Sequence, residues 1–316
     1  MKIVVFGTGP FCVPTFQWLL DSEHDVAAVV TRPIEDAGKR RKTIANPVRQ
    51  AAEQSNVIVL APESCNTAEF VEQLKSYKAD LFFVCDYGQI LSKTCLETAG
   101  MGGINLHGSL LPRYRGAAPI QWAIYNGDEE LGVSVIHMTP KMDAGPVLST
   151  ASQTFNKTQN SDEIETILSQ IGVDAVSDSI HQLSKWDRTS EIGTKQDKSL
   201  ATPAPRIKKA DGKIDWTRTA HQLVDQIRAF TPWPTSYCQW DHGKQPLRLI
   251  IQRASVMNVE TTAPAGVVVA VEKKLLVVQT SNGALSIEQL QPAGKKSMPV
   301  ADFLRGNQIS VGQTMS

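Results

Sequence analysis

Short apolar segments that alternate with helical patterns constrain the fold of this chain more than any other feature. The apolar segments lie at residues 3–6, 26–30 and 81–85, and helical patterns begin near Thr67, Pro119 and Ser161. A short run that is apolar at every position is typical of a strand buried on both faces of a sheet. Strands that alternate with helices form a mainly parallel sheet, so the first half of the chain is predicted to be a Rossmann-like α/β domain.

The second half of the chain has a different pattern. Residues 189–206 are polar, lack periodicity and include two prolines, which is typical of a linker. A helical pattern at 220–230 is followed by strand-like runs at 237–240, 247–254, 266–271, 275–280 and 285–290. Short strands at this spacing predict a small β-barrel of the OB-fold type. We therefore expect a Rossmann-like domain over 1–188, a linker over 189–206 and an OB-like domain over 207–316.

Charged residues are distributed unevenly between these parts. The 316 residues carry 32 Lys and Arg and 32 Asp and Glu, so the formal net charge is zero. Residues 207–316 contain 13 basic and 8 acidic side chains, whereas residues 1–206 contain 19 and 24. A basic C-terminal third is one property of proteins that contact phosphate backbones, although scattered surface charge produces the same imbalance.

The cysteines and the distribution of apolar residues indicate the cellular compartment of the protein. Its five cysteines form no CxxC pair and have no Cys/His spacing of a metal site. An odd, scattered set is typical of a reducing compartment without disulfides. The chain starts with a strand rather than a secretory leader, and no apolar run approaches the roughly 20 residues of a transmembrane helix. These patterns predict a cytoplasmic protein with no metal site and no membrane partner.

Two polar side chains mark the end of a further expected strand, in the sequence Ile104-Asn105-Leu106-His107-Gly108. Alternate side chains of a strand share a face, so Asn105 and His107 are expected to point the same way. An amide beside an imidazole can polarise a carbonyl group and transfer a proton. The pair is a candidate site for acyl chemistry, although polar residues also end strands simply because loops are polar.

Asp143 is the candidate third member of this site. It lies in a turn flanked by glycine and proline, after the alternating run 133–138. If that run is a strand of the same parallel sheet, Asp143 lies at the edge where ligands bind and is expected to face His107 and orient its imidazole. An Asp in such a turn is otherwise an ordinary turn residue.

The loop after the first strand resembles a dinucleotide-binding turn only in part. Gly7-Thr8-Gly9 is followed by Cys12 where a third glycine is required. Prolines in the same segment remove amide donors that a pyrophosphate would need. A tight strand-to-helix turn is favoured, and no NAD or other nicotinamide cofactor is expected.

Runs of basic side chains are candidate contacts with a nucleic-acid backbone. They are Lys39-Arg40-Arg41-Lys42, in a long loop, and the pairs Lys208-Lys209 and Lys295-Lys296. A run of this kind is equally compatible with a solvated loop. The segment 113–116 has the same ambiguity, between a clamp for phosphate or carboxylate and a solvated loop.

The longest motif resembles the signature of the folate-dependent formyltransferases. It runs from Asn105-Leu106-His107-Gly108-Ser109-Leu110-Leu111-Pro112 to Ile120, and Asp143-Ala144-Gly145 is similar to the second catalytic motif of that family. Stretches at 212–216, 230–234 and 290–296 are similar to the branch of the family that acts on aminoacylated tRNA. The resemblance covers essentially the whole chain.

This resemblance implies formyl transfer from 10-formyltetrahydrofolate to the amino group of methionine on initiator tRNA, by a monomer that needs no metal. The implied catalytic residues are Asn105, His107 and Asp143. The implied folate contacts are Ser109, Leu110, Leu111, Pro112, Tyr87, Gly88 and Ile90. The implied tRNA contacts are Lys39, Arg40, Arg41, Lys42, Lys208, Lys209, Lys295 and Lys296. Asp86, which adds a charge directly before Tyr87, has no role in this scheme.

Three other functions compete with this one. A formyltransferase that acts on an amino-sugar nucleotide has the same catalytic core, but the basic loop and the positive C-terminal third favour tRNA, which offers many more phosphates. A purine-pathway formyltransferase needs only about one domain, so the additional C-terminal domain weighs against it. A non-catalytic RNA-binding protein would not need the complete set of Asn105, His107 and Asp143.

Overall fold

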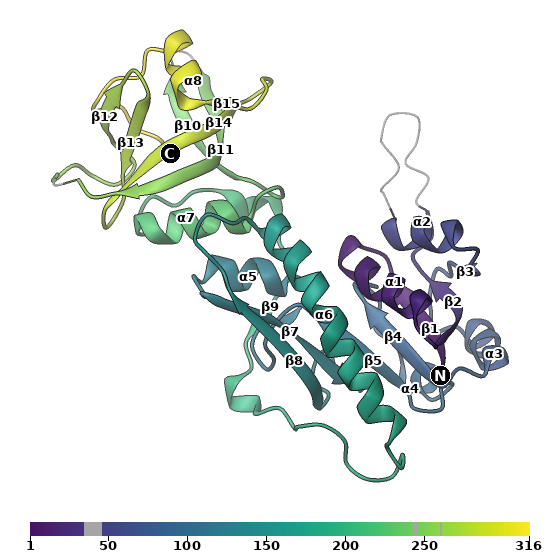
Figure 1. The fold of residues 1–316 in the computed structure, drawn as a ribbon. Helices are drawn as coiled ribbons and strands as arrows, with labels where there is room; N and C mark the ends of the chain where they lie inside the picture. Colours follow the sequence, from purple (N-terminus) through teal and green to yellow (C-terminus); the bar gives the residue numbers. More distant parts are fainter. Residues whose placement is uncertain (35–45, 243–244, 260) are drawn as a thin grey trace. The chain divides into compact units, whose positions relative to one another are not determined.

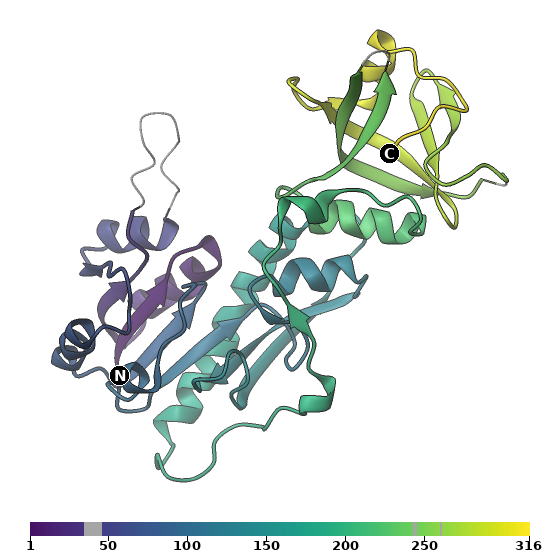
Figure 2. The same ribbon diagram turned by 180° about the vertical axis from the view of Figure 1, so that it is seen from behind.

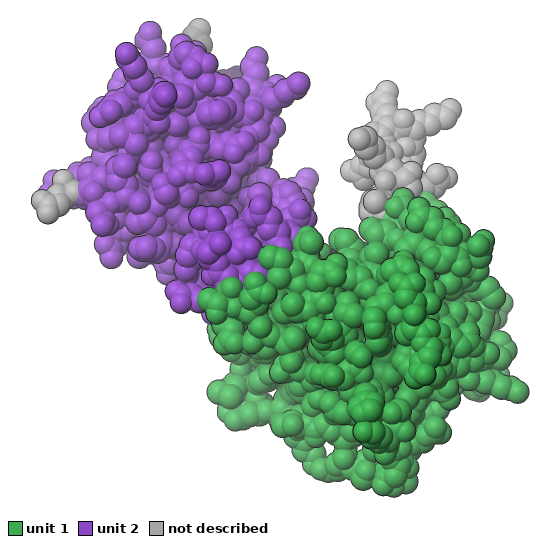
Figure 3. All heavy atoms as spheres, in the orientation of Figure 1, with its two compact units in different colours: residues 1–119, 130–154, 165–205 green, residues 120–129, 155–164, 206–316 purple. Residues whose placement is uncertain are grey.

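The computed structural model describes residues 1–34, 46–242, 245–259 and 261–316. The chain forms two compact units, which are coloured separately in Figure 3. Unit 1 contains residues 1–119, 130–154 and 165–205, and unit 2 contains residues 120–129, 155–164 and 206–316. Two segments from the first half of the chain therefore belong to unit 2, because they pack on the C-terminal elements.

Unit 1 is built on a seven-stranded sheet with the strand order β3-β2-β1-β4-β5-β7-β8 (Figure 1). Its strands are β1 (Lys2–Gly7), β2 (Asp25–Val30), β3 (Val59–Leu60), β4 (Leu81–Cys85), β5 (Gly103–His107), β7 (Glu130–His137) and β8 (Val147–Thr154). The first five in this order are parallel, whereas β7 and β8 are antiparallel to their neighbours. The expected mainly parallel, Rossmann-like sheet is confirmed.

Three of the helices of unit 1 begin at a residue whose side chain caps the first turn. They are α1 (Val13–Asp21), α2 (Pro47–Gln54), α3 (Ala68–Tyr77), α4 (Lys93–Leu96) and most of α6 (Ser161–Ser184). The Thr67 side chain accepts a hydrogen bond from the backbone N–H of Phe70 and so fixes the start of α3. Phe70 then packs with Phe82 and Val84 of β4 in one buried cluster, which explains the continuous apolar character of that strand.

The order of the strands reverses between β1 and β4. From β1 the chain first continues outward to β2 and β3, and it then returns to place β4 on the other side of β1. Gly7 at the end of β1 lies beside Cys85 at the end of β4. Ligands of open α/β sheets bind in the crevice at such a switch point, beyond the carboxyl ends of the strands.

One face of β5 is covered by α6, which runs along the sheet in both views (Figures 1 and 2). A Cβ on Gly172 of α6 would lie 2.9 Å from Leu106 Cδ2, so the helix and the strand are in close contact there. Because side chains alternate along a strand, Asn105 and His107 project from the opposite face. The helix thus leaves the polar face of β5 available for a site.

The polar stretch that follows α6 returns to the sheet of unit 1. It contains η2 (Lys198–Leu200) and β9 (Pro203–Ala204), and β9 pairs with β6 (Arg115–Gly116). A Cβ on Gly116 would lie 2.4 Å from the Ala204 carbonyl oxygen, so only glycine fits at this crossing. Residues up to 205 belong to unit 1 for this reason.

Unit 2 has an antiparallel six-stranded sheet, as expected for the C-terminal part. Its main strand order is β10 (Ser236–His242), β11 (Gln245–Met257), β14 (Ala284–Pro292), β13 (Leu275–Gln279) and β12 (Val268–Glu272), and β15 (Met298–Pro299) pairs with β14. The helical elements of the unit are α5 (Pro119–Tyr125), most of which lies in it, η3 (Lys209–Gly212), α7 (Ala220–Ala229) and α8 (Val300–Gly306). Asn282-Gly283, a pair that favours a hairpin turn, lies in the connection between β13 and β14.

The last residues of the chain connect the two edges of this sheet. Gln239 of β10 exchanges two backbone hydrogen bonds with Ser316, and Met315 donates to the carbonyl oxygen of Gly266, just before β12. Isolated bridges join Trp240 to Met315 in the same way. The C-terminal segment therefore closes the sheet into the barrel that the strand pattern predicts.

The described residues contain no candidate membrane span and no candidate metal cluster. None of the helices has the length and apolar character that a membrane span requires. No three His, Cys, Asp or Glu side chains in the described ranges gather closely enough to hold a metal ion.

Candidate active site

His107 is the last residue of β5 and is 5 % exposed. Its Nε2 lies 2.9 Å from the carbonyl oxygen of Tyr114. A carbonyl oxygen only accepts hydrogen bonds, so Nε2 carries the hydrogen. The second ring nitrogen, Nδ1, lies 3.8 Å from Oδ1 of Asp143, a distance that is too long for a hydrogen bond. The imidazole is therefore fixed on one side, and its Nδ1 faces a carboxylate across a narrow gap.

The backbone of Asp143 has a conformation that residues with a side chain rarely adopt. Its φ is +48°, in the left-handed region, and its Oδ2 accepts a hydrogen bond of 2.8 Å from the backbone N–H of Gly116. Strained backbone of this kind concentrates at functional sites, because the surrounding structure must maintain it. The hydrogen bond to Gly116 leaves Oδ1 directed at His107.

Asp143 approaches His107 by a different route from the one expected. The run 133–138 forms most of β7, which is antiparallel to β5, so its last residue, His137, pairs with Ile104 near the start of β5. The expectation of a parallel strand was wrong. Asp143 belongs to the loop 138–146 between β7 and β8, and this loop folds back over the face from which His107 projects.

Gln196 holds the loop 138–146 in place and was not identified from the sequence. Its Nε2 donates to the carbonyl oxygens of Asp143 (2.9 Å) and Gly145 (2.7 Å). Its Oε1 accepts two hydrogen bonds from the guanidinium of Arg115, at 3.1 and 2.6 Å. Arg115 therefore acts inside the fold, rather than as a clamp for a ligand. No motif marks Gln196, because it lies in an aperiodic polar stretch and meets Asp143 across 53 positions of sequence.

Asn105 lies on the same face of β5 as His107 and is half-buried. Its backbone is paired with Val84 of β4 and Ile136 of β7, which fixes its position in the centre of the sheet. No other described residue hydrogen-bonds its side-chain amide. Its two N–H groups are thus available to a ligand.

The segment after β5 forms a tight turn whose polar groups serve the fold. The Ser109 hydroxyl donates to the carbonyl oxygen of Arg113 (2.7 Å), and the Ser134 hydroxyl donates to the Ser109 carbonyl oxygen (2.8 Å). The peptide bond between Leu111 and Pro112 is cis. The hydrogen bonds hold the turn 109–112, the segment expected to contact folate, and the Ser109 hydroxyl is used inside it.

The other segment expected to contact folate follows β4. The Tyr87 side chain is 2 % exposed and packs edge-on against Phe6, so it belongs to the core. Arg32 donates to the carbonyl oxygens of Tyr87 (3.1 Å) and Gly88 (2.8 Å) and so holds this loop in place. Ile90 is 61 % exposed, an unusual degree for a large apolar side chain. Gly88 and Ile90 are thus accessible to a planar apolar ring, whereas the Tyr87 side chain is not.

The expected basic contacts in unit 2 lie at its surface. Lys208, Lys209, Lys295 and Lys296 are all exposed, and their ammonium groups have no ion-pair partner in the part of the chain that the structure describes. The run Lys39-Arg40-Arg41-Lys42 lies outside the described residues.

Arg248 of β11 extends this basic surface and was not identified from the sequence. Its guanidinium stacks on the ring of Tyr237, 3.6 Å from the ring centroid. Its carbonyl oxygen accepts the backbone N–H of Ala293, two residues before Lys295. Tyr237 also pairs with Lys213, next to η3, which contains Lys209. The stacked Arg248 and Tyr237 therefore lie between the segment that carries Lys295 and the segment that carries Lys209.

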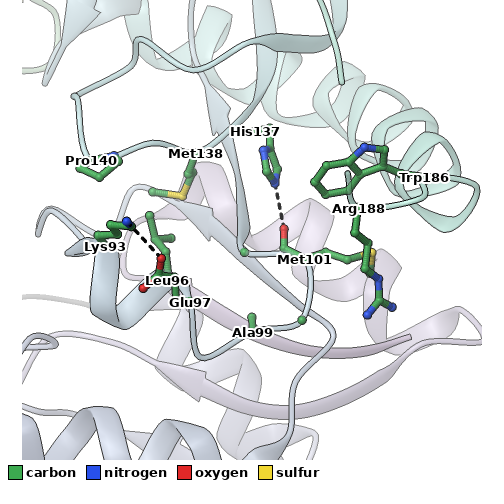
Figure 4. A pocket seen from close by; sticks show the side chains of 12 residues that line it. Lys93, Leu96, Glu97, Ala99, Met101, His137, Met138, Pro140, Trp186 and Arg188 are labelled. Carbon is green, nitrogen blue, oxygen red and sulfur yellow. Dashed lines mark hydrogen bonds and ion pairs between the residues drawn. The ribbon is translucent and has the colours of Figure 1, made fainter. Parts of the chain in front are cut away.

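A second hollow lies beside the start of β5, away from Asn105 and His107 (Figure 4). Its volume is about 510 Å³, and Arg188, Trp186 and Met138 are among the residues that line it. Figure 4 shows His137 directed at the Met101 carbonyl oxygen, at 2.8 Å from Nε2. None of the residues singled out in the sequence lines this hollow, although it touches the beginning of the loop that carries Asp143.

Comparison with protein families gives two matches along the chain. Residues 1–180 match the family described as formyl transferase. Residues 206–308 match the family described as formyl transferase, C-terminal domain. Together these matches cover both units of the structure.

Full-length relatives and solved structures agree with these matches. The chain is 40 % identical to a methionyl-tRNA formyltransferase of Rhodopirellula baltica over the whole chain and 96 % of the relative. It is 39 % identical to one of Hydrogenovibrio crunogenus, over the whole chain and 98 % of the relative. The sugar 3N-formyl transferase WlaRD has the same fold, with a TM-score of 0.65 at 17 % identity over 94 % of this chain and 99 % of that one. HypX of Aquifex aeolicus in complex with tetrahydrofolic acid has a TM-score of 0.62 at 15 % identity, over 99 % of this chain and 50 % of that one.

Proposed function

Because the chain belongs to the formyl transferase family, we propose that it transfers a formyl group from 10-formyltetrahydrofolate to the amino group of methionyl-initiator tRNA. The observation that carries this proposal is the juxtaposition of Asn105, His107 and Asp143 at one strand end, with Nδ1 of His107 facing Oδ1 of Asp143 at 3.8 Å. The choice of acceptor follows from the methionyl-tRNA formyltransferases that are 35–40 % identical to the chain. The basic surface of unit 2 suits such an acceptor.

Asn105 stabilises the charge that develops during transfer. When an amine attacks the formyl carbon, the carbonyl oxygen becomes negative, and the Asn105 amide donates a hydrogen bond to it. Removal of one such donor slows related reactions by roughly 100–1,000-fold. The position of Asn105 in a central strand, paired on both sides, keeps this donor in place before the charge appears.

His107 accepts the proton of the attacking amine, and Asp143 stabilises the charge that results. The Tyr114 carbonyl keeps a hydrogen on Nε2 of His107, so Nδ1 is the nitrogen that can receive a proton. A proton on Nδ1 turns the 3.8 Å contact with Asp143 into an attraction between opposite charges. The proton then passes to the departing folate nitrogen when the bond from the formyl carbon to that nitrogen breaks.

Folate binding is assigned to the two segments that border this site. Ile90 offers an exposed apolar side chain, and residues 109–112 form a turn after β5 that hydrogen bonds with Arg113 and Ser134 hold in place. The chemistry of these residues fits a planar ring with an apolar face and amide edges.

A direct assay tests the proposed function. The purified protein is incubated with 10-formyltetrahydrofolate and, in separate reactions, with methionyl-initiator tRNA, dTDP-3-aminofucose or phosphoribosylglycinamide. We expect formylation of the tRNA alone. Formylation of the sugar nucleotide or of phosphoribosylglycinamide instead of the tRNA would refute the proposed acceptor, and no transfer to any of the three would refute the activity.

A further inference from the structure

Asp86 lies at the carboxyl ends of β4 and β1, where the strand order reverses and where open α/β sheets bind their ligands. It is the first residue after β4, and its neighbour Cys85 pairs with Gly7 at the end of β1. The β1 side of this edge is formed by Thr8 and Gly9. Asp86 is exposed at this edge, and no part of the catalytic set described above uses it.

The carboxylate of Asp86 is directed at the β1 side. A Cβ on Gly9 would lie 1.6 Å from Oδ2 of Asp86, so the carboxylate occupies the space that any side chain at position 9 would need. Asp86 has a φ of +50°, a conformation that costs free energy for a residue with a side chain. The turn thus directs this carboxylate toward Gly9.

The surroundings of Asp86 leave the carboxylate without a partner. No hydrogen bond or ion pair joins it to another residue in the described ranges. The charged group that faces it is Arg32, whose guanidinium is already bound to the carbonyl oxygens of Tyr87 and Gly88. The thiol of Cys85 lies next to it as well. Although Asp86 is exposed, the protein around its carboxyl group removes part of its hydration, which raises its pKa to about 6 against the opposing effect of Arg32.

A carboxylate without a partner at a ligand-binding edge determines which chemical groups of a ligand can bind beside it. It repels phosphate and accepts hydrogen bonds from N–H and O–H groups. The aminoacyl end of a charged tRNA carries two such groups, the α-amine of the amino acid and the hydroxyl of the terminal ribose. Both belong to the acceptor, and the acceptor must come close to His107, which ends the strand next to β4.

We propose that Asp86 is a specificity-determining residue of the acceptor site, whose carboxylate accepts a hydrogen bond from an N–H or O–H group at the aminoacyl end of the tRNA. This inference rests on the proposed function. It assigns the β1 side of this edge to the acceptor, while the loop after Asp86 and the turn after β5 remain with the folate donor.

Kinetics of Asp86→Asn test this assignment. We expect the KM for methionyl-initiator tRNA to rise by about tenfold, the effect of losing one charge-assisted hydrogen bond. The KM for 10-formyltetrahydrofolate is expected to change less than twofold. The matched control is Asp174→Asn, which removes the same charge from an exposed position on α6 of the same unit. An unchanged tRNA KM, or a rise in the folate KM alone, would overturn the inference.

Binding to charged and uncharged tRNA distinguishes the two possible donor groups. If the ribose hydroxyl is the partner, Asp86→Asn weakens binding of both forms of tRNA. If the α-amine is the partner, the variant weakens binding of the charged form only. Equal affinities of wild type and variant for both forms would contradict any contact of Asp86 with the acceptor.

The pH profile provides a readout that a purely structural role would not change. Because the carboxyl group of Asp86 is protonated below about pH 6, it loses its capacity as an anionic acceptor there. For the wild type, kcat/KM for the tRNA is therefore expected to fall as the pH decreases through 6. In Asp86→Asn this part of the decrease in kcat/KM should be absent. An equal decrease in both proteins would show that another group titrates there and would contradict the role of Asp86.

A second variant covers the case in which Asp86→Asn folds poorly. Asp86→Gly removes the carboxylate and suits the positive φ, so it preserves the turn. The same rise in the tRNA KM is expected, and an unchanged tRNA KM in Asp86→Gly would refute the inference. A wild-type protein that formylates no methionyl-tRNA would refute the proposed function, which is a different outcome from an active enzyme that tolerates both substitutions.

Discussion

At the scale of single residues, the orientation of His107 depends on groups that take no part in the reaction. The Tyr114 carbonyl determines which ring nitrogen carries the hydrogen, and Gly116 determines which oxygen of Asp143 faces the ring. Gln196 acts one step further out, since it binds the backbone of Asp143 and Gly145. Groups of this kind hold a catalytic side chain within the narrow range of positions that transfer requires.

Replacement of Gln196 tests this positioning role. In Gln196→Ala the carbonyl oxygens of Asp143 and Gly145 lose their donor, and the Arg115 guanidinium loses its acceptor. We expect kcat to fall by roughly 10–100-fold, because Asp143 moves relative to His107. The KM values for both substrates should change little, and steady-state kinetics separate the two parameters.

A matched control for this variant is Gln182→Ala. The Gln182 amide also donates to a backbone carbonyl, that of Leu148, and Gln182 belongs to the same unit. Its removal is expected to leave kcat within about twofold of the wild type, since surface hydrogen bonds contribute little. Equal losses of kcat in the two variants would show that Gln196 has no particular effect on the site.

At the scale of elements, the active-site loop 138–146 depends on the antiparallel pairing of β7 and β8. Gly145 makes this loop possible, because a Cβ there would lie 1.9 Å from the His137 carbonyl oxygen. That atom belongs to the backbone of β7 and cannot move aside as a side chain would. In the Asp143-Ala144-Gly145 motif, the glycine thus permits the path of the chain, and Asp143 is the proposed reactive group.

Substitution of Gly145 by alanine is therefore expected to displace the loop. Gly145→Ala should lower kcat by about 100-fold through the movement of Asp143, and should destabilise the protein by about 1–3 kcal/mol. Thermal unfolding and steady-state kinetics measure the two effects. Gly306→Ala is the control, since a Cβ at Gly306 meets nothing within 4 Å. A Gly145→Ala protein with wild-type kcat would contradict this role of the loop.

At the scale of the whole molecule, the proposed reactive groups and the proposed cationic contacts with the acceptor lie in different units. The candidate catalytic residues belong to unit 1, whereas the exposed lysine pairs and Arg248 belong to unit 2. A tRNA is long enough to contact several distant surfaces at once, and contacts with its phosphates add affinity without reading sequence. Under the proposed function, this separation allows a chain of zero net charge to bind a polyanion through the basic surface of one unit.

The salt dependence of tRNA binding tests the role of unit 2. Replacement of Lys295 and Lys296 together by alanine should weaken binding and reduce the slope of log K against log salt by about 2, one for each phosphate contact. The matched control replaces Lys273 and Lys274, an exposed pair in the β12–β13 turn of the same unit. Identical slopes in the wild type and the 295/296 variant would exclude these lysines as phosphate contacts.

Local sequence pattern was sufficient for much of this protein. The apolar segment at 81–85, the cap at Thr67 and the pair Asn282-Gly283 each predict an element correctly, because burial and backbone preference act within a few residues. The placement of Asn105 and His107 on one face follows from the two-residue repeat of a strand.

The features that the sequence pattern did not predict depend on contacts between segments that are distant in the chain. The direction of β7 could not be predicted, because a strand of alternating residues pairs equally well in either direction. Gln196 meets Arg115 across 81 positions and Asp143 across 53, and nothing near it in sequence signals either contact. Asp86 looked like an isolated charge until the fold placed its carboxylate over Gly9. Hydrophobic periodicity is local and so can be seen in the chain itself, whereas the approach of two polar groups exists only after the sheet has brought their strands together.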